Sequence, residues 1–411
     1  MSVQAPEPAP SLREKLAAIG VVLVHALRDG THLPPVGLVK PVAVESPEEE
    51  ALIARIVAAY QAQKRQHPGG WEGISNRNKS WRDDGWNHSQ AGLLDRLEAG
   101  DTAAVGAMLR TMFRQPLMTG IAMGADEYSA VFLGAGDPRV YSAQWLDAFV
   151  GLAEEVGAVG VPNPEVNPEA FTAALDCDVD SLLSRINDCV GLPLEFPSIG
   201  EAFGCRVGNL VLPRITLFHY ATAAILRDLW GQQAPGAVLE IGGGFGGLAA
   251  LIAARACRRY VGIDLPAACA IQAYFLCRAR PDLSIRLFGE TSSTEPDIEL
   301  LPSWTLEPTC EYALQERAFD LLVNQDALLE MEPSEAVVLL KALSRVVHGR
   351  LLSISPDFSG SANSRGEPTI SELADESGYW RRISRAAFLP RAGYWREVYL
   401  NSGHIDSGSV V

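Results

Sequence analysis

The feature that most constrains this chain is a glycine-rich turn between a strand-like and a helix-like segment. Residues 237–241 (AVLEI) form a short apolar run of the kind found in buried strands. Five glycines occupy the six positions 242–247, and a helical pattern, LAALI, begins at residue 248. Glycine lets the backbone turn sharply and lets a ligand approach main-chain N–H groups at a helix start. We therefore expect a ligand site here, because a purely structural turn would not need five glycines.

The rest of the C-terminal half shows strand-like runs that alternate with helical ones. This alternation is typical of a doubly wound sheet, in which helices connect parallel strands. The sequence therefore predicts an α/β, Rossmann-like fold with a mainly parallel sheet. After the first strand, the strands are expected at 259–264, 284–289, 319–324, 349–355 and 395–400.

The first half of the chain has helical periodicity and few strand-like runs. Ser46-Pro47-Glu48-Glu49 predicts a helix start, with a capping serine, a proline at the first helical position and acids near the positive end of the helix dipole. We expect a disordered, proline-rich tail at 1–10, an N-terminal all-helical domain at 11–205 and the α/β domain at 206–411, with the boundary inside 200–235. Further helices are expected at 91–100, 102–114, 143–156, 168–175, 179–187 and 217–230.

Charge and cysteine content exclude several classes of function. The 411 residues include 50 acids against 34 Lys and Arg, a net charge of −16, so a general nucleic-acid binder is not expected. The seven cysteines are odd in number and form no C-x-x-C pair, which favours a reducing bacterial cytoplasm. The apolar run 17–27 is too short for a bilayer, and Glu7 and Glu14 argue against a signal peptide. The seven histidines lack zinc-site spacing, so no metal is expected.

Two acidic residues indicate which nucleoside the turn binds. Asp264 ends the second predicted strand, where it can accept hydrogen bonds from ribose hydroxyls. Glu240 lies two residues before the first glycine, and a carboxylate there would repel the pyrophosphate of NAD or FAD. The same carboxylate suits a cofactor that carries a sulfonium and an ammonium group. We therefore predict S-adenosyl-L-methionine as the cofactor.

The residues around the turn also resemble a known family. EIGGGFGGLA (240–249) followed by YVGIDLP (260–266) resembles the glycine and acidic motifs of class I S-adenosylmethionine-dependent methyltransferases. With Gly208-Asn209 and NQDALLEM (324–331), the set is similar to a family of sugar O-methyltransferases, which commonly has a Ser or similar residue where this chain has DALL. The resemblance covers about 200–403 and implies a seven-stranded sheet.

The resemblance also implies roles for residues at the strand ends. Asp264 would bind the ribose and Leu265 would flank the adenine, while Phe245 could lie against the sulfonium or pack under the turn. Glu290 could meet the adenine edge or lie in a solvated loop. The remaining cofactor contacts are expected from Glu240, Gly242, Gly243, Gly244, Gly246, Asn324 and Gln325.

The candidate catalytic residues are Asp326 and Glu330. A hydroxyl acceptor must lose its proton as the new C–O bond forms, so a general base assists the transfer. The four-residue spacing would place both carboxylates on one face if a helix begins there. The alternatives are a helix cap for Asp326 and a carboxylate that complements the helix dipole for Glu330. His219 is expected to be a buried core histidine.

Substrate contacts are expected from a tryptophan-rich segment at 71–89. Trp71, Trp81 and Trp86 would either form a lid over the ligand or fill the seam between the two domains. Asn209 joins them as a candidate substrate contact, and Gln272 faces either the site or solvent. The pair Arg381-Arg382 is expected to be solvated surface.

These observations together predict an S-adenosylmethionine-dependent methyltransferase. Its acceptor would be a hydroxyl of a sugar or another small hydroxylated metabolite. One alternative is an enzyme that cyclises the methionine portion and releases methylthioadenosine, and another is a catalytically silent cofactor-binding protein. We expect a small-molecule substrate, no nucleic-acid or membrane partner, and leave a homodimer open.

Overall fold

The structure is a computed structural model, and only part of the chain is described in it. The predicted tail at 1–10, the apolar run at 17–27, Trp71 and Trp81 lie outside the described residues, and so does the side chain of Trp86. The described residues are 33–39, 46–67, 86–122, 124–160, 165–169, 178–230, 236–306, 314, 318–357 and 368–404.

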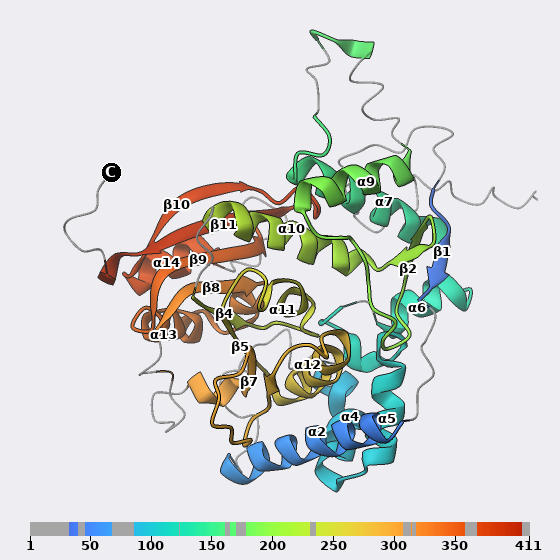
Figure 1. Cartoon of the computed structure of the whole chain (residues 1–411). Helices are drawn as coiled ribbons and strands as arrows, with labels where there is room; N and C mark the ends of the chain where they lie inside the picture. Colours follow the sequence, from blue (N-terminus) through green and yellow to red (C-terminus); the bar gives the residue numbers. More distant parts are fainter. Residues whose placement is uncertain are drawn as a thin grey trace, which may run out of the picture.

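A mainly parallel sheet forms the centre of the C-terminal half, in the strand order β10-β11-β9-β8-β4-β5-β7-β6 (Figure 1). The strands from β9 to β6 in this order are parallel, and β11 runs antiparallel to both β9 and β10. The chain order reverses between the neighbours β4 and β8, which is where open α/β sheets bind ligands. The strands are β4 (Ala237–Ile241), β5 (Arg259–Asp264), β6 (Ile285–Arg286), β7 (Ile298–Pro302), β8 (Phe319–Gln325), β9 (Val347–Pro356), β10 (Trp380–Ala387) and β11 (Tyr394–Asn401).

The predicted α/β sheet is therefore confirmed, but the expected count of seven strands is wrong. The strand expected at 284–289 is only the two-residue β6, and β7, which the sequence analysis missed, pairs with β5 instead. Strand β10 was also missed. Five consecutive residues of this strand are exposed, so its sequence lacks the alternation of apolar and polar residues that indicates a half-buried strand.

Both faces of the sheet are covered by helices because successive side chains of a strand point to opposite sides. On one face Val238 packs with α10 (Arg214–Trp230), α11 (Gly247–Ile252) and α12 (Pro266–Ala279). On the other, Leu239 and Ile241 pack with α13 (Pro333–Leu343) and α14 (Ile370–Ser377). The strands thus have the two apolar faces of a doubly wound fold.

The N-terminal half is rich in helices but is not all-helical. Ser46 caps the first helix by accepting from the Glu49 N–H at 3.3 Å, as predicted. Strand β1 (Val36–Leu38) pairs with β2 (Phe203–Val207), and β2 pairs with β3 (Leu210–Leu212), so a small antiparallel sheet lies where only helices were expected. The sequence hides it, because β1 and β3 are three residues long and β1 pairs with a segment far along the chain. The helices are α2 (Pro47–Gln66), α4 (Trp86–Ala99), α5 (Thr102–Arg110), α6 (Ala125–Phe132), α7 (Pro138–Glu155) and α9 (Val179–Val190), with the 3-10 turns η2 (Met112–Arg114) and η3 (Pro116–Met118).

The two halves share one hydrophobic core, which runs from α2 through α7 and α10 to the sheet. The buried Glu49 carboxylate on α2 accepts from the Tyr274 hydroxyl and from Arg278 on α12, both at 2.7 Å, and from Arg110 at 3.0 Å. The Trp145 indole N–H on α7 donates to the Leu212 carbonyl at 2.7 Å. The helical half is therefore packed directly onto the sheet. The expected boundary at 205/206 falls inside β2.

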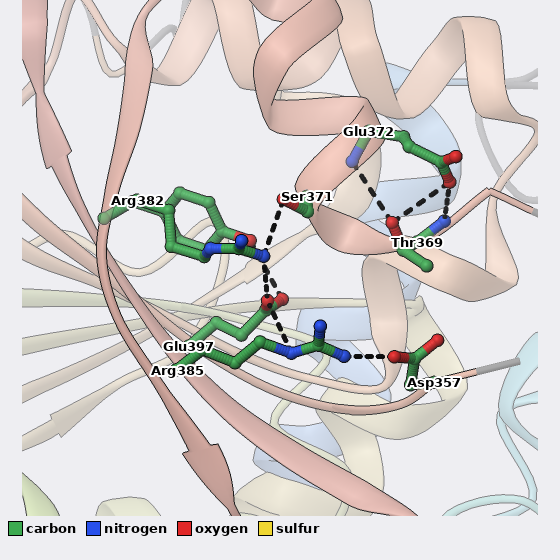
Figure 2. A network of polar contacts seen from close by, with 8 residues as sticks. Asp357, Thr369, Ser371, Glu372, Arg382, Arg385 and Glu397 are labelled. Carbon is green, nitrogen blue, oxygen red and sulfur yellow. Dashed lines mark hydrogen bonds and ion pairs between the residues drawn. The ribbon is translucent and has the colours of Figure 1, made fainter. Parts of the chain in front are cut away.

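The edge of the sheet is held by charged side chains (Figure 2). Arg382 on β10 donates to Glu397 on β11 and to Ser371 on α14, both at 2.9 Å, and Arg385 pairs with Asp357. Arg381 and Arg382 are exposed, as expected, and Arg382 also joins β10 to its neighbours through these contacts. None of the helices in the described ranges is long and apolar enough to cross a bilayer.

Candidate active site

A cavity of about 180 Å³ lies at the carboxyl ends of β4, β5 and β8, between the sheet and the helical half. Its wall brings together residues from both halves of the chain. From the sheet come Gly242–Gly244, Phe245, Asp264, Leu265, Gln325, Asp326, Ala327 and Glu330; from elsewhere come Gly120, Ile121, Ile215, Phe218, His219, Phe388, Arg391 and Tyr394.

The glycine turn is shaped by backbone conformations that favour glycine. Gly242, Gly244 and Gly246 have φ values of +73°, +61° and +88°. A Cβ on Gly242 would collide with Ala327, so the close approach of β4 to β8 also requires glycine there. Gly246 faces Leu276 and does not line the cavity, which makes it a packing residue rather than the ligand contact expected.

Asp264 is held rigidly at the cavity wall. Its Oδ2 accepts from the Gly244 N–H at 2.9 Å and from Gln272 Nε2 at 2.8 Å, and its Oδ1 accepts from the Leu265 N–H at 2.7 Å. Burial raises the pKa of Asp264 to about 7, although these three hydrogen bonds oppose the shift. Gln272 is 1% exposed, so it faces Asp264 and not solvent, but it does not line the cavity.

Glu240 lies behind the glycine turn and not in the cavity wall. It is 1% exposed, accepts from the Tyr260 hydroxyl and receives a 3.4 Å hydrogen bond from Gln325 Nε2. Burial, followed by the charge of Asp264, raises the pKa of Glu240 to about 7. The strand points this side chain across to Tyr260 on β5, so its contact with the methionine portion stays a prediction.

Phe245 packs under the turn, which was the alternative to a contact with the sulfonium. Its ring makes edge-to-face contacts with Phe113 and Phe275, at centroid distances of 5.2 and 4.8 Å, and lies 5.3 Å from the His219 ring. Only a small part of the ring reaches the cavity. His219 is buried, as expected, and also lines the cavity, and burial lowers its pKa to about 4, so its imidazole is neutral at pH 7.

The two residues that end β8 differ in position. Asn324 is fully buried, donates to Ser353 Oγ at 2.9 Å and accepts from the Leu328 N–H at 2.9 Å. It therefore joins β8 to β9 and does not reach the cavity, contrary to expectation. Gln325 does line the cavity. Its Oε1 accepts from Thr222 on α10 at 3.0 Å, which fixes the amide.

Asp326 adopts an unusual backbone conformation at the mouth of the cavity. It has a φ of +69°, which costs a non-glycine residue about 1–3 kcal/mol and is characteristic of functional sites. Its Oδ2 pairs with Arg391 Nη1 at 3.0 Å, and its buried Oδ1 has no hydrogen-bond partner among the described residues. It makes no side-chain capping bond to the following 3-10 helix η6 (Ala327–Glu330), so the cap alternative is wrong.

Glu330 shares the cavity wall with Asp326, as the four-residue spacing predicts. It is the last residue of η6, which is a single turn of four residues, so the interpretation as a carboxylate that complements a helix dipole stays a prediction. Burial, and then the negative charges of Asp326 and Asp264, raises the pKa of Glu330 to about 8, while Arg391 opposes the shift. Such a carboxyl can accept a proton near neutral pH.

Two of the predicted contacts lie away from the cavity. Asn209 is exposed in the turn between β2 and β3. Glu290 accepts from Arg55 Nη2 and from the Leu287 N–H, both at 2.8 Å, so its carboxylate is occupied by the helical half. Neither residue contributes to the cavity wall.

Several wall residues have no local sequence signal. Arg391 comes from the loop between β10 and β11, and Tyr394 is the first residue of β11. The Arg391 guanidinium lies 3.7 Å from the Tyr394 ring centroid and 5.5 Å from that of Phe218. Ile121 comes from the turn after η3. Ile121 reaches the cavity because the helical half packs on the sheet, whereas Arg391 and Tyr394 reach it from the β10–β11 end of the sheet itself.

A wider cavity of about 760 Å³ adjoins the first. It extends between α6, α7 and the β10–β11 loop, and its polar lining includes Glu127, Gln144, Asp147 and Arg214. The two cavities share Gly120, Ile121, Ile215, Phe218, Asp326, Phe388, Arg391 and Tyr394. In the part of the chain that the structure describes, no group of three or more His, Cys, Asp or Glu could hold a metal ion.

Comparison with known proteins finds similarity in solved structures alone. No protein-family model and no curated protein matches the sequence. The N-methyltransferase NodS from Bradyrhizobium japonicum is 16% identical, with a TM-score of 0.33 over 44% of this chain and 93% of its own. Magnesium protoporphyrin IX methyltransferase from Synechocystis, solved with bound SAM, is 15% identical, with a TM-score of 0.32 over 46% of this chain and 82% of its own. The [4+2]-cyclase SpnF is 14% identical, with a TM-score of 0.32 over 44% and 82%. Likenesses this weak establish neither activity nor substrate.

Proposed function

We propose that this chain is an S-adenosylmethionine-dependent methyltransferase that acts on a hydroxyl of a small metabolite. The observation that carries the proposal is the charge around the glycine turn. The smaller cavity is walled by three carboxylates, Asp264, Asp326 and Glu330, against the single guanidinium of Arg391. Glu240 adds a fourth carboxyl directly behind the turn.

This charge balance favours a cationic nucleoside over a dinucleotide. Burial raises the pKa values of Asp264 and Glu240 to about 7 and that of Glu330 to about 8, so each carboxylate is costly to ionise without a nearby cation. A ligand with sulfonium and ammonium groups would offset that cost. A pyrophosphate would instead add two negative charges beside the same carboxylates.

The residues of the turn fit this cofactor in three ways. Asp264 would accept hydrogen bonds from ribose hydroxyls, Leu265 would pack on the adenine, and the glycines would allow the ligand close to the backbone. When bound, S-adenosylmethionine supplies a methyl group that its positive sulfur activates. Asp264 already has Gly244, Leu265 and Gln272 as partners, so the carboxylate is oriented before the ligand arrives.

The wider cavity gives the acceptor a place beside the cofactor cavity. Methyl transfer depends mainly on holding the acceptor oxygen in line and on excluding water. Glu330, in the cofactor cavity wall, would accept the hydroxyl proton in its ionised form. A sugar is our preferred acceptor, on the strength of the motif resemblance around 324–331.

The arrangement gives less support to the two alternatives. Cyclisation of the methionine portion would be served by a site closed to other molecules, whereas this cavity opens into a space several times larger. A silent binding protein would not need a proton acceptor, whereas Glu330 is held in the wall with a raised pKa.

The product formed from S-adenosylmethionine tests the proposal. The purified protein is incubated with the cofactor, alone and with mixed sugars and hydroxy acids, and the products are identified by mass spectrometry. Acceptor-dependent S-adenosylhomocysteine is the expected result. Methylthioadenosine would select cyclisation, and binding without turnover would select the silent protein. Calorimetry that detects no binding of S-adenosylmethionine or S-adenosylhomocysteine would refute all three.

A further inference from the structure

The wider cavity contains an arginine without a carboxylate partner. Arg214, the first residue of α10, donates through Nη1 to Gln144 Oε1 at 2.6 Å, and its guanidinium lies 5.9 Å from the Tyr141 ring centroid. No carboxylate of the described residues lies within ion-pairing distance of it, and its Nε and Nη2 have no hydrogen-bond partner there. Arg391 in the same cavity differs, because it is paired with Asp326.

An arginine in this position is costly unless an anion neutralises it. Burial is the main cause that lowers the pKa of Arg214, and the charge of Arg391 lowers it further, while Tyr141 and the carboxylate of Glu127 oppose the shift. The guanidinium nevertheless stays protonated at any physiological pH. Its charge is therefore compensated only in part, by the more distant carboxylate of Glu127, until an anion enters the cavity.

We propose that the wider cavity binds the acceptor by a carboxylate, with Arg214 as its anchor and the amide of Gln144 beside it. The proposal rests on the methyltransferase function above and narrows its substrate class to hydroxy acids, sugar acids among them. The planar guanidinium can donate to both carboxylate oxygens, which fixes orientation as well as position. The acceptor hydroxyl would then point from the wider cavity toward Glu330, which lies in the wall of the smaller cavity.

The other charges in the cavity favour a carboxylate over a phosphate. Glu127 and Asp147 also line the cavity. Glu127 Oε2 accepts from the Gly124 N–H at 3.1 Å, which places this carboxylate at the start of α6. A dianionic phosphate would be both repelled by these acids and attracted by Arg214 about twice as strongly as a singly charged carboxylate, because Coulomb energy scales with charge. Since two acids face one arginine that has no carboxylate partner, and Asp326 and Arg391 neutralise each other, the net charge of the cavity favours the ligand with the smaller charge.

Binding of matched sugars to the protein loaded with S-adenosylhomocysteine tests the proposal. Sodium D-glucuronate and sodium D-gluconate are compared with their neutral counterparts, D-glucose and D-glucitol, and with glucose 6-phosphate, by calorimetry. We expect at least one of the acids to bind about tenfold or more tightly than its neutral counterpart, and glucose 6-phosphate to bind less tightly than glucuronate.

Variants of Arg214 show whether this residue causes the preference. Arg214→Gln should remove the preference, and Arg214→Lys, which keeps the charge but loses the planar group, should retain part of it. Arg345→Gln, at an exposed arginine beyond α13, is the matched control and should bind as the wild type does. Affinity for S-adenosylhomocysteine should be the same in all of these proteins, which also shows that each is folded.

The outcomes separate this proposal from the methyltransferase function. It is overturned if neither acid binds better than its neutral counterpart, if Arg214→Gln keeps the preference, or if the phosphate binds more tightly than glucuronate. Failure of the wild type to bind S-adenosylhomocysteine would instead refute the proposed function, and the acceptor proposal with it.

Discussion

The two adjoining cavities are built in different ways. The cofactor end is centred on one stretch of chain, from β4 through the glycine turn to Asp264 and Leu265 at the end of β5, and residues from α10, β8, η6 and the β10–β11 loop complete its wall. The acceptor end is assembled from α6, α7, the start of α10 and the β10–β11 loop. A contiguous motif supplies the centre of the first cavity, whereas the second is created entirely by packing between distant segments.

The two ends also differ in charge. Carboxylates gather at the cofactor end, whereas the acceptor end has both signs and an arginine without a carboxylate partner. This difference means that one end attracts a cation and the other accepts an anion, with the Asp326–Arg391 pair between them. Changes at one end should therefore leave binding at the other end almost unchanged.

The largest expected effect is on turnover and comes from a change in the wall of the cofactor end. Glu330→Gln keeps the shape of the side chain but cannot accept a proton, so kcat should fall about 100- to 1000-fold. Wild-type kcat/KM should rise as the pH increases through about 8, because the base works only when ionised, and the variant should lose this dependence. Affinity for S-adenosylmethionine should change less than about tenfold. The exposed Glu376→Gln is the control, and a Glu330→Gln enzyme with normal kcat would exclude Glu330 as the base.

A smaller effect, confined to the cofactor end, is expected from Asp264→Asn. Loss of charge-assisted hydrogen bonds to ribose should weaken S-adenosylhomocysteine binding about 100-fold. With the variant saturated by that ligand, the preference for glucuronate over glucose should stay within about threefold of the wild type. Asp282→Asn removes an exposed partner of Arg280 and is the matched control. A variant that loses both binding functions would show that the two ends are one coupled site.

The smallest effect is a release of protons on cofactor binding. At pH 7 the carboxyls of Asp264, Glu240 and Glu330 are partly protonated, because their pKa values are raised to about 7, 7 and 8. A cationic ligand favours their ionised forms, so about one proton should be released per S-adenosylmethionine bound, and fewer for S-adenosylhomocysteine, which lacks the sulfonium. Calorimetry in buffers of different ionisation enthalpy measures this number. Equal release by both ligands would mean that the carboxyls do not sense the sulfonium.

The same pKa values set the sign of the pH dependence of ligand-free stability. The folded protein holds these protons to higher pH than the unfolded chain does, since the folded pKa values lie above the ordinary ones. The contribution of these groups to the free energy of unfolding is therefore fully present below about pH 4 and is lost as the pH rises to about 7 or 8. Bound S-adenosylmethionine should reduce this loss.

Sequence reasoning located the central strands and the glycine turn because their signals are local. Strands β4, β5, β8, β9 and β11 match the predicted runs within two residues. It misplaced residues whose role depends on what packs beside them. Asn324 donates to Ser353 on β9, and Glu290 accepts from Arg55, a residue far away in the sequence, so neither side chain lines the cavity.

The sequence by itself determined the mainly parallel sheet, the turn that needs glycine, the positions of Asp264 and Asp326 at strand ends, and the spacing that brings Glu330 to the same cavity wall as Asp326. These follow from backbone sterics and from alternation along single segments. Only the tertiary structure decided that Glu240 lies behind the turn, that Asp326 pairs with Arg391, and that a wider cavity opens beside the first. These contacts depend on packing between segments that are far apart in the sequence, so they cannot be predicted from any short stretch of it.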